Sequence, residues 1–270
     1  MNIAFLGGGN MASALIGGLV AKGFDARSLS VVEVSPAARE RLGAKYPVHT
    51  ATAPDADTQR ADTIVLAVKP QDMRAALASL GASVRGKLVI SIAAGVRISA
   101  LSRWLGGHRR IVRCMPNTPA LIGAGISGLY APPEVTAEDR KNAATVLGAV
   151  GEVVWVADEK HLDPVTAVSA SGPAYVFWLI EQLAAFAEST GITREDSLRL
   201  AKHCVLGSAQ LALNASETPE QLRKNVTSKG GTTEAALRVF ENEQLAERFA
   251  KALAAATRRG AELGDELAKD

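Results

Sequence analysis

The chain has 270 residues, of which 47% are apolar, 21% are charged and 4% are aromatic. The net charge is only +2 and no basic run is longer than two residues, so we expect neither general disorder nor a nucleic-acid partner. The apolar content is sufficient for a sizeable core in one large domain or two modest ones.

Targeting and metal-binding signals are absent from the sequence. The start, MNIAFLGGGN, has no basic segment and is interrupted by glycines, so we expect no signal peptide. The most apolar long stretch, residues 165–187, contains Gly172-Pro173 and Glu181-Gln182, which favours a buried helix over a membrane span. Cys114 and Cys204 lie far apart, which indicates reduced thiols in a cytoplasmic protein. The histidines are scattered and have no ligand partner at metal-site spacing, so we expect no metal.

Strands and helices are expected to alternate over the first 160 residues. The pattern predicts strands at residues 3–6, 30–34, 63–68, 88–92, 111–113, 126–130 and 152–156, with helices at 12–21, 37–44, 71–80 and 137–147. Such alternation is typical of right-handed βαβ units and a largely parallel sheet covered on both faces. We therefore expect an α/β fold, with a Rossmann-type, doubly wound parallel sheet over residues 1–160.

Only helices are predicted after residue 160, so residues 161–270 should form an all-helical domain. Ser171 is the expected N-cap of the first long helix, with Pro173 in its first turn. Further helices are predicted at residues 195–213, 219–225, 232–241 and 244–267. The helix after Pro173 is apolar around most of its circumference, so we expect it to be buried, including against a second subunit.

The strongest local motif follows the first strand and reads Gly7-Gly8-Gly9-Asn10-Met11-Ala12. This is the G-x-G-x-x-A pattern between a strand and a helix that dinucleotide binding requires. Gly7 permits the tight turn, and Gly9 lacks the Cβ that would keep the backbone away from a pyrophosphate. The N–H groups at the helix start, at Asn10 and Met11, would then face the phosphates. The alternative is a glycine-rich turn before an ordinary helix.

The type of cofactor is predicted from the end of the second strand, which reads Glu33-Val34-Ser35 with Arg39 shortly after. An acidic residue at this position binds the ribose hydroxyls of NAD, but Glu33 comes early and strand alternation can turn it away. Ser35 and Arg39 can instead donate to the 2′-phosphate of NADP. We expect NADPH to be preferred with NADH possible; the alternative is that Arg39 is a solvated helix charge.

Three further segments leave predicted strands and are candidates for cofactor binding. Val68, Lys69 and Pro70 end one strand, and the lysine there either reaches the cofactor or lies on the surface. Ala93-Ala94 follow the next strand and allow close backbone approach. Asn117 lies between two prolines that hold the loop, where it can donate to a carboxamide or a ribose, unless the loop is only a rigid connector.

A second glycine-rich turn lies in the predicted helical region. Ser228, Gly230, Gly231, Thr232 and Thr233 precede an Ala/Leu-rich helix. A Gly-Gly turn with hydroxyl groups at a helix N-terminus forms an anion-binding nest, which suits a substrate carboxylate. The alternative is a helix cap and a turn with no ligand.

Taken together, these motifs resemble the Δ1-pyrroline-5-carboxylate reductase family over nearly the whole chain. The resemblance rests on GGGNMA at residues 7–12, AVKP at 67–70, AAGV at 93–96, RCMPNTP at 113–119, SGPAY at 171–175 and SKGGTTEAAL at 228–237. In many relatives an asparagine near the end of the third strand contacts the adenosine. The chain departs from this pattern, with Thr52-Ala53-Pro54-Asp55-Ala56-Asp57 at that place.

The resemblance implies hydride transfer from NAD(P)H to the C=N carbon of 1-pyrroline-5-carboxylate, giving L-proline. It implies that the helical domain forms a dimer, or a higher oligomer, with the substrate at the dimer interface. The substrate carboxylate would be held by backbone N–H groups of Gly230, Gly231, Thr232 and Thr233, and the Thr233 hydroxyl would bind the ring nitrogen as the catalytic residue. Segments matched by Lys69-Pro70, Ala93-Ala94 and Asn117 would line the cofactor.

Two other functions fit parts of the sequence. The first is a related reductase of another cyclic imine or a 3-hydroxy acid. The 3-hydroxyacid dehydrogenases use a lysine on the first helix of the C-terminal domain, and residues 171–188 contain none. The second is a non-enzymatic NAD(P)-binding regulator, which would be expected to lose the substrate turn that this chain keeps at residues 228–233.

Overall fold

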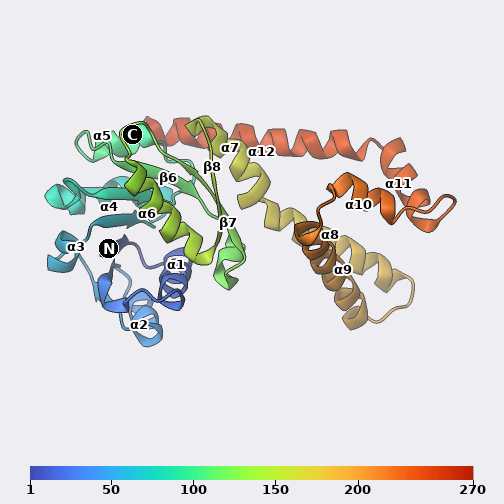
Figure 1. Cartoon of the computed structure of the whole chain (residues 1–270), viewed down its shortest axis with the longest axis horizontal. Coiled ribbons are helices and arrows are strands. Elements are labelled where there is room, and N and C mark those ends of the chain that lie inside the picture. The colour runs from blue at the N-terminus through green and yellow to red at the C-terminus, as the bar shows by residue number, and fades with distance from the viewer. Residues whose placement is uncertain (270) are drawn as a thin grey trace. The chain divides into compact units, whose positions relative to one another are not determined.

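The computed structural model describes residues 1–269, and contacts within the chain divide it into two compact units (Figure 1). The first unit contains Met1–Ser171 together with the chain from Ala255 onward, and the second contains Gly172–Ala254. The domain boundary predicted at residue 160 stays a prediction. Among the described residues, no helix combines the length and the apolar character needed to cross a membrane.

The first unit is built on an eight-stranded sheet in the order β3-β2-β1-β4-β5-β6-β7-β8. Its strands are β1 (Ile3–Leu6), β2 (Leu29–Val32), β3 (His49–Ala51), β4 (Thr63–Leu66), β5 (Leu88–Ser91), β6 (Ile111–Met115), β7 (Gly125–Tyr130) and β8 (Gly151–Trp155). Neighbouring strands are parallel, apart from β6 and β7. The first six strands follow the doubly wound order of dinucleotide-binding sheets, which confirms the predicted fold class.

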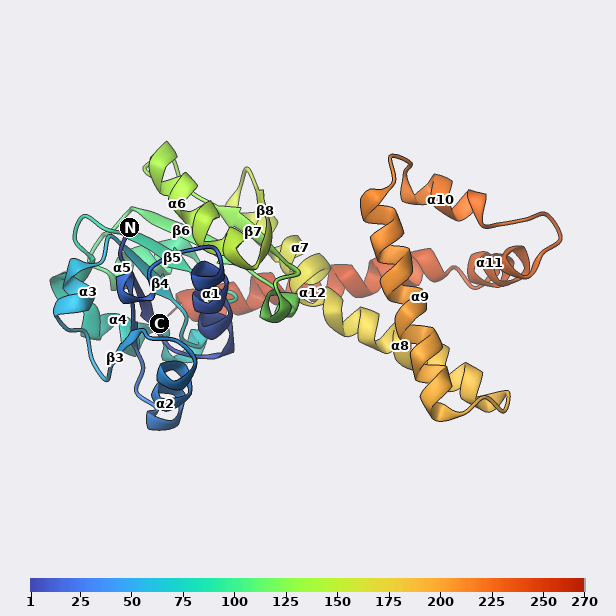
Figure 2. The same ribbon diagram turned by 60° about the horizontal axis from the view of Figure 1, so that its bottom comes forward.

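Helices cover both faces of this sheet, as Figures 1 and 2 show. They are α1 (Asn10–Ala21), α2 (Pro36–Lys45), α3 (Ala56–Arg60), α4 (Met73–Leu80), α5 (Ile98–Trp104), α6 (Ala137–Leu147) and α7 (Leu162–Val165). Phe5 and Val31 pack in one apolar cluster with residues of α1 and α6. Ile64 and Leu66 pack in a second cluster with residues of α4 and α5. The continuous apolar strands are therefore buried on both sides, as parallel strands require.

The second unit is all-helical and contains α8 (Gly172–Ser189), α9 (Arg194–Asn214), α10 (Pro219–Asn225), α11 (Thr232–Asn242) and the start of α12 (Leu245–Ala268). Helices α8 and α9 pack against each other (Figure 2). Within the single chain, α8 is exposed over most of its length, with Phe177, Trp178 and Phe186 among its exposed large side chains. These apolar side chains require a further covering surface.

Ser171 is not the N-cap of α8, so this prediction was wrong. Its backbone is helical, with φ −84° and ψ −23°, whereas an N-cap residue is extended. A π-helical turn at Thr166–Ala170 follows α7 and precedes a bend at Ser171, whose N–H donates to the Thr166 carbonyl at 2.8 Å. The chain is therefore already helical before Ser171, although α8 itself begins at Gly172. Such π-helical turns are frequent at functional sites.

The part of α12 from Ala255 onward belongs to the first unit and lies near α5 (Figure 1). Gly264 is buried, and a Cβ added there would lie 3.1 Å from the Gly95 carbonyl oxygen. Arg97 donates to the Ala261 carbonyl at 3.3 Å, and Arg103 donates to the Ala268 carbonyl at 2.6 Å. The helix therefore supports the backbone of the loop that follows β5.

Candidate active site

Five predicted cofactor segments meet at one edge of the sheet. Residues 7–11 follow β1, Ser35 follows β2, residues 68–70 follow β4, Ala93-Ala94 follow β5 and Asn117 follows β6. The strands are parallel and in register, with Leu6 opposite both Val32 and Leu66. Their carboxyl ends therefore lie together. The chain reverses its winding direction between β1 and β4, which is where such sheets bind their ligands.

The turn after β1 has the geometry that dinucleotide binding needs. Gly7 has φ +103°, and a Cβ on it would lie 2.7 Å from the Ala67 carbonyl oxygen, so glycine is required by both conformation and space. Gly9 is exposed, and a Cβ on it would meet no atom within 4 Å. Gly9 caps α1 without any side-chain hydrogen bond. The open space above Gly9 and the uncapped helix N-terminus fit a pyrophosphate.

The Glu33 carboxylate bonds to the protein's own backbone. One oxygen accepts the Gly8 N–H at 2.7 Å, and the other accepts the Ser35 N–H at 2.7 Å. Arg39 donates through Nη1 to the carbonyls of Glu33 and Val34, at 2.7 and 3.0 Å. The remaining guanidinium donors of Arg39 and the exposed Ser35 lie at the same corner. This corner carries a cation and a hydroxyl that can take a 2′-phosphate.

The loops after β4 and β5 leave their backbones accessible. Lys69 and Ala94 are exposed, whereas Ala93 is buried. Pro70 begins a single 3₁₀ turn, Pro70–Asp72, in which the Asp72 N–H donates to the Lys69 carbonyl at 3.0 Å. The short side chains after β5 leave room for a flat ring to approach the backbone.

Asn117 is buried and bonds within the fold. Its Oδ1 accepts the Ile126 N–H at 2.9 Å, and its Nδ2 donates to the Ser169 carbonyl at 3.2 Å. It therefore ties the loop after β6 to β7 and to the π-helical turn. One N–H of the amide remains for a ligand. Its role in cofactor binding stays a prediction, but its structural contacts were not anticipated.

A buried ion-pair network supports the loop after β5. Arg113, in the middle of β6, is 2% exposed and donates to Glu159 at 3.1 Å. The same Glu159 oxygen accepts the Ile98 N–H of α5 at 2.8 Å. Asp163 lies 3.8 Å from both Arg113 and Arg97. The sequence offered one signal of this network, because an arginine within an apolar strand must have anionic partners when it is buried.

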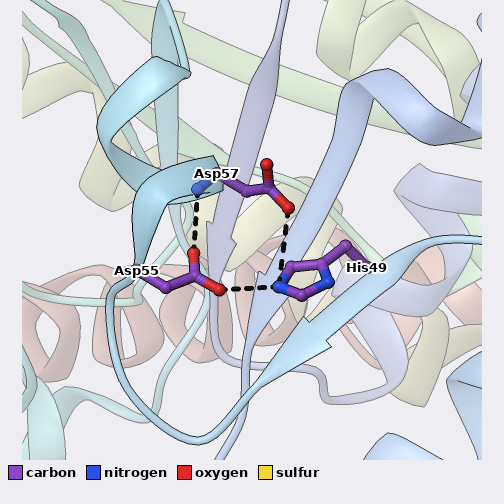
Figure 3. A group of neighbouring side chains, drawn as sticks. All are labelled: His49, Asp55 and Asp57. Atoms are coloured by element: carbon purple, nitrogen blue, oxygen red, sulfur yellow. Dashed lines mark hydrogen bonds and ion pairs between the residues drawn. The ribbon is translucent and has the colours of Figure 1, made fainter.

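His49 has two carboxylate neighbours that the sequence spacing did not reveal (Figure 3). Its Nε2 lies 2.6 Å from Asp55 and 3.5 Å from Asp57. Burial would raise the pKa of the Asp55 carboxyl, but hydrogen bonds from His49 and Thr58 outweigh it and hold this pKa below its ordinary value. Asp55 also caps α3 through the backbone N–H groups of Asp57 and Thr58. Asp55 therefore acts as the N-cap of α3 through one carboxylate oxygen, and its other oxygen bonds to His49.

The glycine-rich turn of the second unit immediately precedes α11. The Gly231 N–H donates to the Ser228 carbonyl at 3.0 Å, and the Gly230 N–H donates to the Glu234 carboxylate at 2.8 Å. Four backbone N–H groups were predicted to bind the substrate carboxylate. Those of Gly230 and Gly231 already donate to groups within the protein. Gly231 caps α11 without a side-chain bond, so the first-turn N–H groups at Thr232 and Thr233 have no such cap.

Thr233 is partly buried, and among residues 1–269 its hydroxyl makes no hydrogen bond. A hydroxyl at a helix N-terminus can both donate and accept, which suits a ring nitrogen that changes its protonation. Thr232 is more exposed. Glu234 was not among the predicted site residues; its position in the first turn, where acidic residues reach back to free N–H groups, was the available signal.

The comparisons with known proteins agree with this architecture. Residues 159–263 match the family described as "Pyrroline-5-carboxylate reductase dimerisation", and residues 2–95 match "NADP oxidoreductase coenzyme F420-dependent". The chain is 42% identical over 266 residues to a pyrroline-5-carboxylate reductase of Pseudomonas aeruginosa, covering 98% of this chain and 97% of the relative.

Two solved structures extend the likeness to three dimensions. A pyrroline-5-carboxylate reductase of Coxiella burnetii has a TM-score of 0.92 and 41% identity, covering 97% of this chain and 98% of that one. The Plasmodium falciparum pyrroline carboxylate reductase, solved with NADP bound, has a TM-score of 0.84 and 28% identity, with 98% of each chain covered. On these grounds the chain belongs to the pyrroline-5-carboxylate reductase family.

Proposed function

We propose that the protein reduces 1-pyrroline-5-carboxylate to L-proline with NADPH as the preferred electron donor. The reaction forms a C–H bond at the carbon of the ring C=N bond, and the ring nitrogen becomes an amine. The bound reduced nicotinamide supplies the hydride, and one proton comes from solution. Family membership over nearly the whole chain supports this activity.

The carboxyl edge of the sheet would hold the cofactor. Asn10 and Met11 offer backbone N–H groups to the pyrophosphate above the open Gly9. Ser35 and Arg39 would bind the 2′-phosphate, which accounts for the preference for NADPH over NADH. Backbone at residues 68–70 and 93–94, with the remaining Asn117 N–H, would position the nicotinamide end.

The second glycine-rich turn would hold the substrate. Thr232 and Thr233 offer first-turn N–H groups to the carboxylate, and the helix dipole favours the negative charge there. The Thr233 hydroxyl would orient the ring nitrogen. A protonated imine is already electrophilic, so positioning and electrostatics are the main contributions required of the protein.

The observation that carries the proposal is the intact turn with its unbonded Thr233 hydroxyl. A dinucleotide site alone is shared by many enzymes, whereas this turn separates an imino-acid reductase from a binding protein. The matched dimerisation region and the exposed apolar side chains of α8 support a homo-oligomer, at least a dimer. Cys114 and Cys204 are both free, and burial raises the pKa of the Cys114 thiol. Free thiols support a location in the reducing cytoplasm.

The direct test is to mix purified protein with 1-pyrroline-5-carboxylate and NADPH, and to follow NADPH absorbance and proline formation. We expect one proline for each NADPH oxidised, and slower turnover with NADH at subsaturating concentrations. Absence of turnover with both cofactors would refute the proposal.

A variant tests the role of the turn. Thr233→Ala should lower kcat roughly ten- to hundredfold, since a hydrogen bond to the reacting ring is worth about 1.5–3 kcal/mol when one partner is charged. Ser216→Ala is the matched control, because this serine is exposed in the same unit. Both variants should keep the wild-type melting temperature. Wild-type kinetics in Thr233→Ala would assign the nitrogen contact elsewhere.

A further inference from the structure

Glu33 lies at the end of β2, where an acidic residue ordinarily accepts hydrogen bonds from a ribose. Here its two carboxylate oxygens accept two backbone N–H groups, those of Gly8 and Ser35, both at 2.7 Å. Bonds between a carboxylate and N–H groups at this distance are the stronger, charge-assisted kind. One side chain thus connects the turn after β1 with the start of α2.

Packing holds the side chain in this orientation. A Cβ on Gly8 would lie 3.2 Å from the Glu33 Cγ, so the stem of Glu33 occupies the space beside the glycine. The backbone of Glu33 is fixed as well, because its N–H donates to the Ala51 carbonyl at 2.9 Å. Its own carbonyl accepts from Arg39 at 2.7 Å. Backbone and side chain of this partly buried residue are therefore both fixed by bonds to the surrounding elements.

From this geometry we propose that Glu33 is a positioning residue, which couples the pyrophosphate turn at Gly8-Gly9 to the 2′-phosphate corner at Ser35 and Arg39. Glu33 holds both corners in place in the cofactor-free protein, and it does not discriminate between NADPH and NADH. Arg39 provides that discrimination.

The proposal separates the two residues by their effects. Loss of the Glu33 bonds loosens a turn that contacts the pyrophosphate, which NADPH and NADH share. Arg39 instead offers a cation that only the 2′-phosphate of NADPH can use. Arg39 is held by the backbone carbonyls of Glu33 and Val34, which a change of the Glu33 side chain leaves in place. Changing Glu33 should therefore weaken both cofactors alike, and changing Arg39 should weaken NADPH selectively. This inference rests on one part of the proposed function, namely that NADPH is the cofactor that binds at this site.

The test measures binding of NADPH and of NADH to substrate-free protein by fluorescence titration, which needs no turnover. Glu33→Gln places an amide NH₂ against one of the two N–H donors. Glu33→Asp keeps the charge but is one methylene too short to reach both donors. Each change should weaken NADPH and NADH by about tenfold, with the ratio of the two affinities kept within about threefold.

Matched variants complete the design. Glu40→Gln changes an exposed carboxylate on α2 and should leave both affinities unchanged. Arg39→Gln should weaken NADPH at least tenfold and NADH little. Thermal unfolding of every variant checks the fold, and Glu33→Asp keeps the test decisive if Glu33→Gln does not fold.

Three results would overturn the proposal. Weakening of NADH alone in Glu33→Gln would make Glu33 a ribose ligand. Tighter NADPH binding in Glu33→Gln, with wild-type binding in Glu33→Asp, would make it a charge discriminator. Unchanged affinities would leave it without a role in binding. A wild-type protein that binds NADPH but does not reduce the imine would refute the proposed function while leaving this inference standing.

Discussion

Gly7 and Gly9 belong to the same turn, yet a side chain at each would meet different surroundings. Gly7 is buried at φ +103°, against the backbone of Ala67. Gly9 is exposed with φ −69°, a conformation that any residue adopts, and nothing lies near its missing Cβ. The first glycine is thus required by the fold, whereas the second leaves open space where we propose the pyrophosphate binds.

Gly9→Val should therefore fold and fail to bind. We expect NADPH affinity to fall about a hundredfold or more, because the side chain fills the space of the pyrophosphate, while the free energy of unfolding changes by about 1 kcal/mol or less. Gly7→Ala should instead destabilise the fold by more than about 1 kcal/mol. Fluorescence titration and urea unfolding of both variants measure the two effects. Unchanged NADPH affinity in folded Gly9→Val would contradict the placement of the cofactor.

A second residue-scale prediction concerns pH and the Arg110–Asp139 pair, joined at 2.7 Å. Burial works to raise the pKa of the Asp139 carboxyl, but hydrogen bonds from Arg110 and Thr136 outweigh it, so the pKa lies below its ordinary value of 3.8. A lowered pKa gives stability that is present above pH 3.8 and is lost as the pH falls through the folded-state value.

Asp139→Asn should accordingly lower the free energy of unfolding by about 1–2 kcal/mol at pH 7, since Arg110 is partly solvent-screened. The difference from wild type should stay constant down to about pH 5 and shrink below pH 3.8. Urea unfolding at several pH values measures it. If the stability difference between wild type and Asp139→Asn grew as the pH fell, the ion pair between Arg110 and Asp139 would not be its source.

At the scale of elements, periodicity and turn residues predicted most of the fold. The helices Ala137–Leu147 and Pro219–Asn225 match their predicted bounds, as does the strand Ile3–Leu6. Among the strands and α-helices of residues 1–269, four short elements were missed: β3, α3, α5 and α7. Strand β3 has only three residues, and α3 has five, too few for a periodic pattern. Helix α5 begins at an N–H accepted by Glu159, which is distant in sequence and leaves no local signal.

The candidate site was predictable to the level of segments. Strand ends and glycines placed every cofactor segment at one edge, since parallel strands share their carboxyl ends. The partners of single side chains were not predictable. Glu33 and Asn117 bond to backbone groups distant in sequence, which a linear pattern does not encode.

The contact between the end of α12 and the loop after β5 gives a further prediction. Gly264 faces the Gly95 carbonyl and the Arg97 guanidinium, each 3.1 Å from its added Cβ. Gly264→Val should force the helix away from the loop after β5, lowering the free energy of unfolding by about 1–3 kcal/mol. Gly43→Val on α2, where nothing lies within 4 Å, controls for the helix propensity of valine. If Gly264→Val and Gly43→Val lowered the free energy of unfolding equally, the contact of Gly264 with the loop after β5 would not contribute to stability.

At the scale of the whole molecule, the second unit exposes an apolar stripe on α8, formed by Val176, Leu179, Leu183 and Phe186. These positions recur at helical spacing, so they share one face. The stripe lies within the region that matches the family's dimerisation domain. A contiguous exposed apolar face of this kind marks an association surface.

Leu183→Glu should therefore shift the protein toward monomers, because a carboxylate would be buried in the interface without a partner. Sedimentation or light scattering at several concentrations measures the change. Glu188→Gln, near the end of the same helix, is the control and should remain oligomeric. A Leu183→Glu protein that kept its wild-type assembly would place the interface on another surface.

Isotopic labelling follows the transferred hydride from the cofactor to the product. NADPH carrying deuterium at both C4 positions is incubated with the protein and 1-pyrroline-5-carboxylate, and the proline is analysed by mass spectrometry and NMR. We predict one deuterium for each NADPH oxidised, on the ring carbon that was double-bonded to nitrogen. Consumption of NADPH with no deuterium in the proline would contradict it.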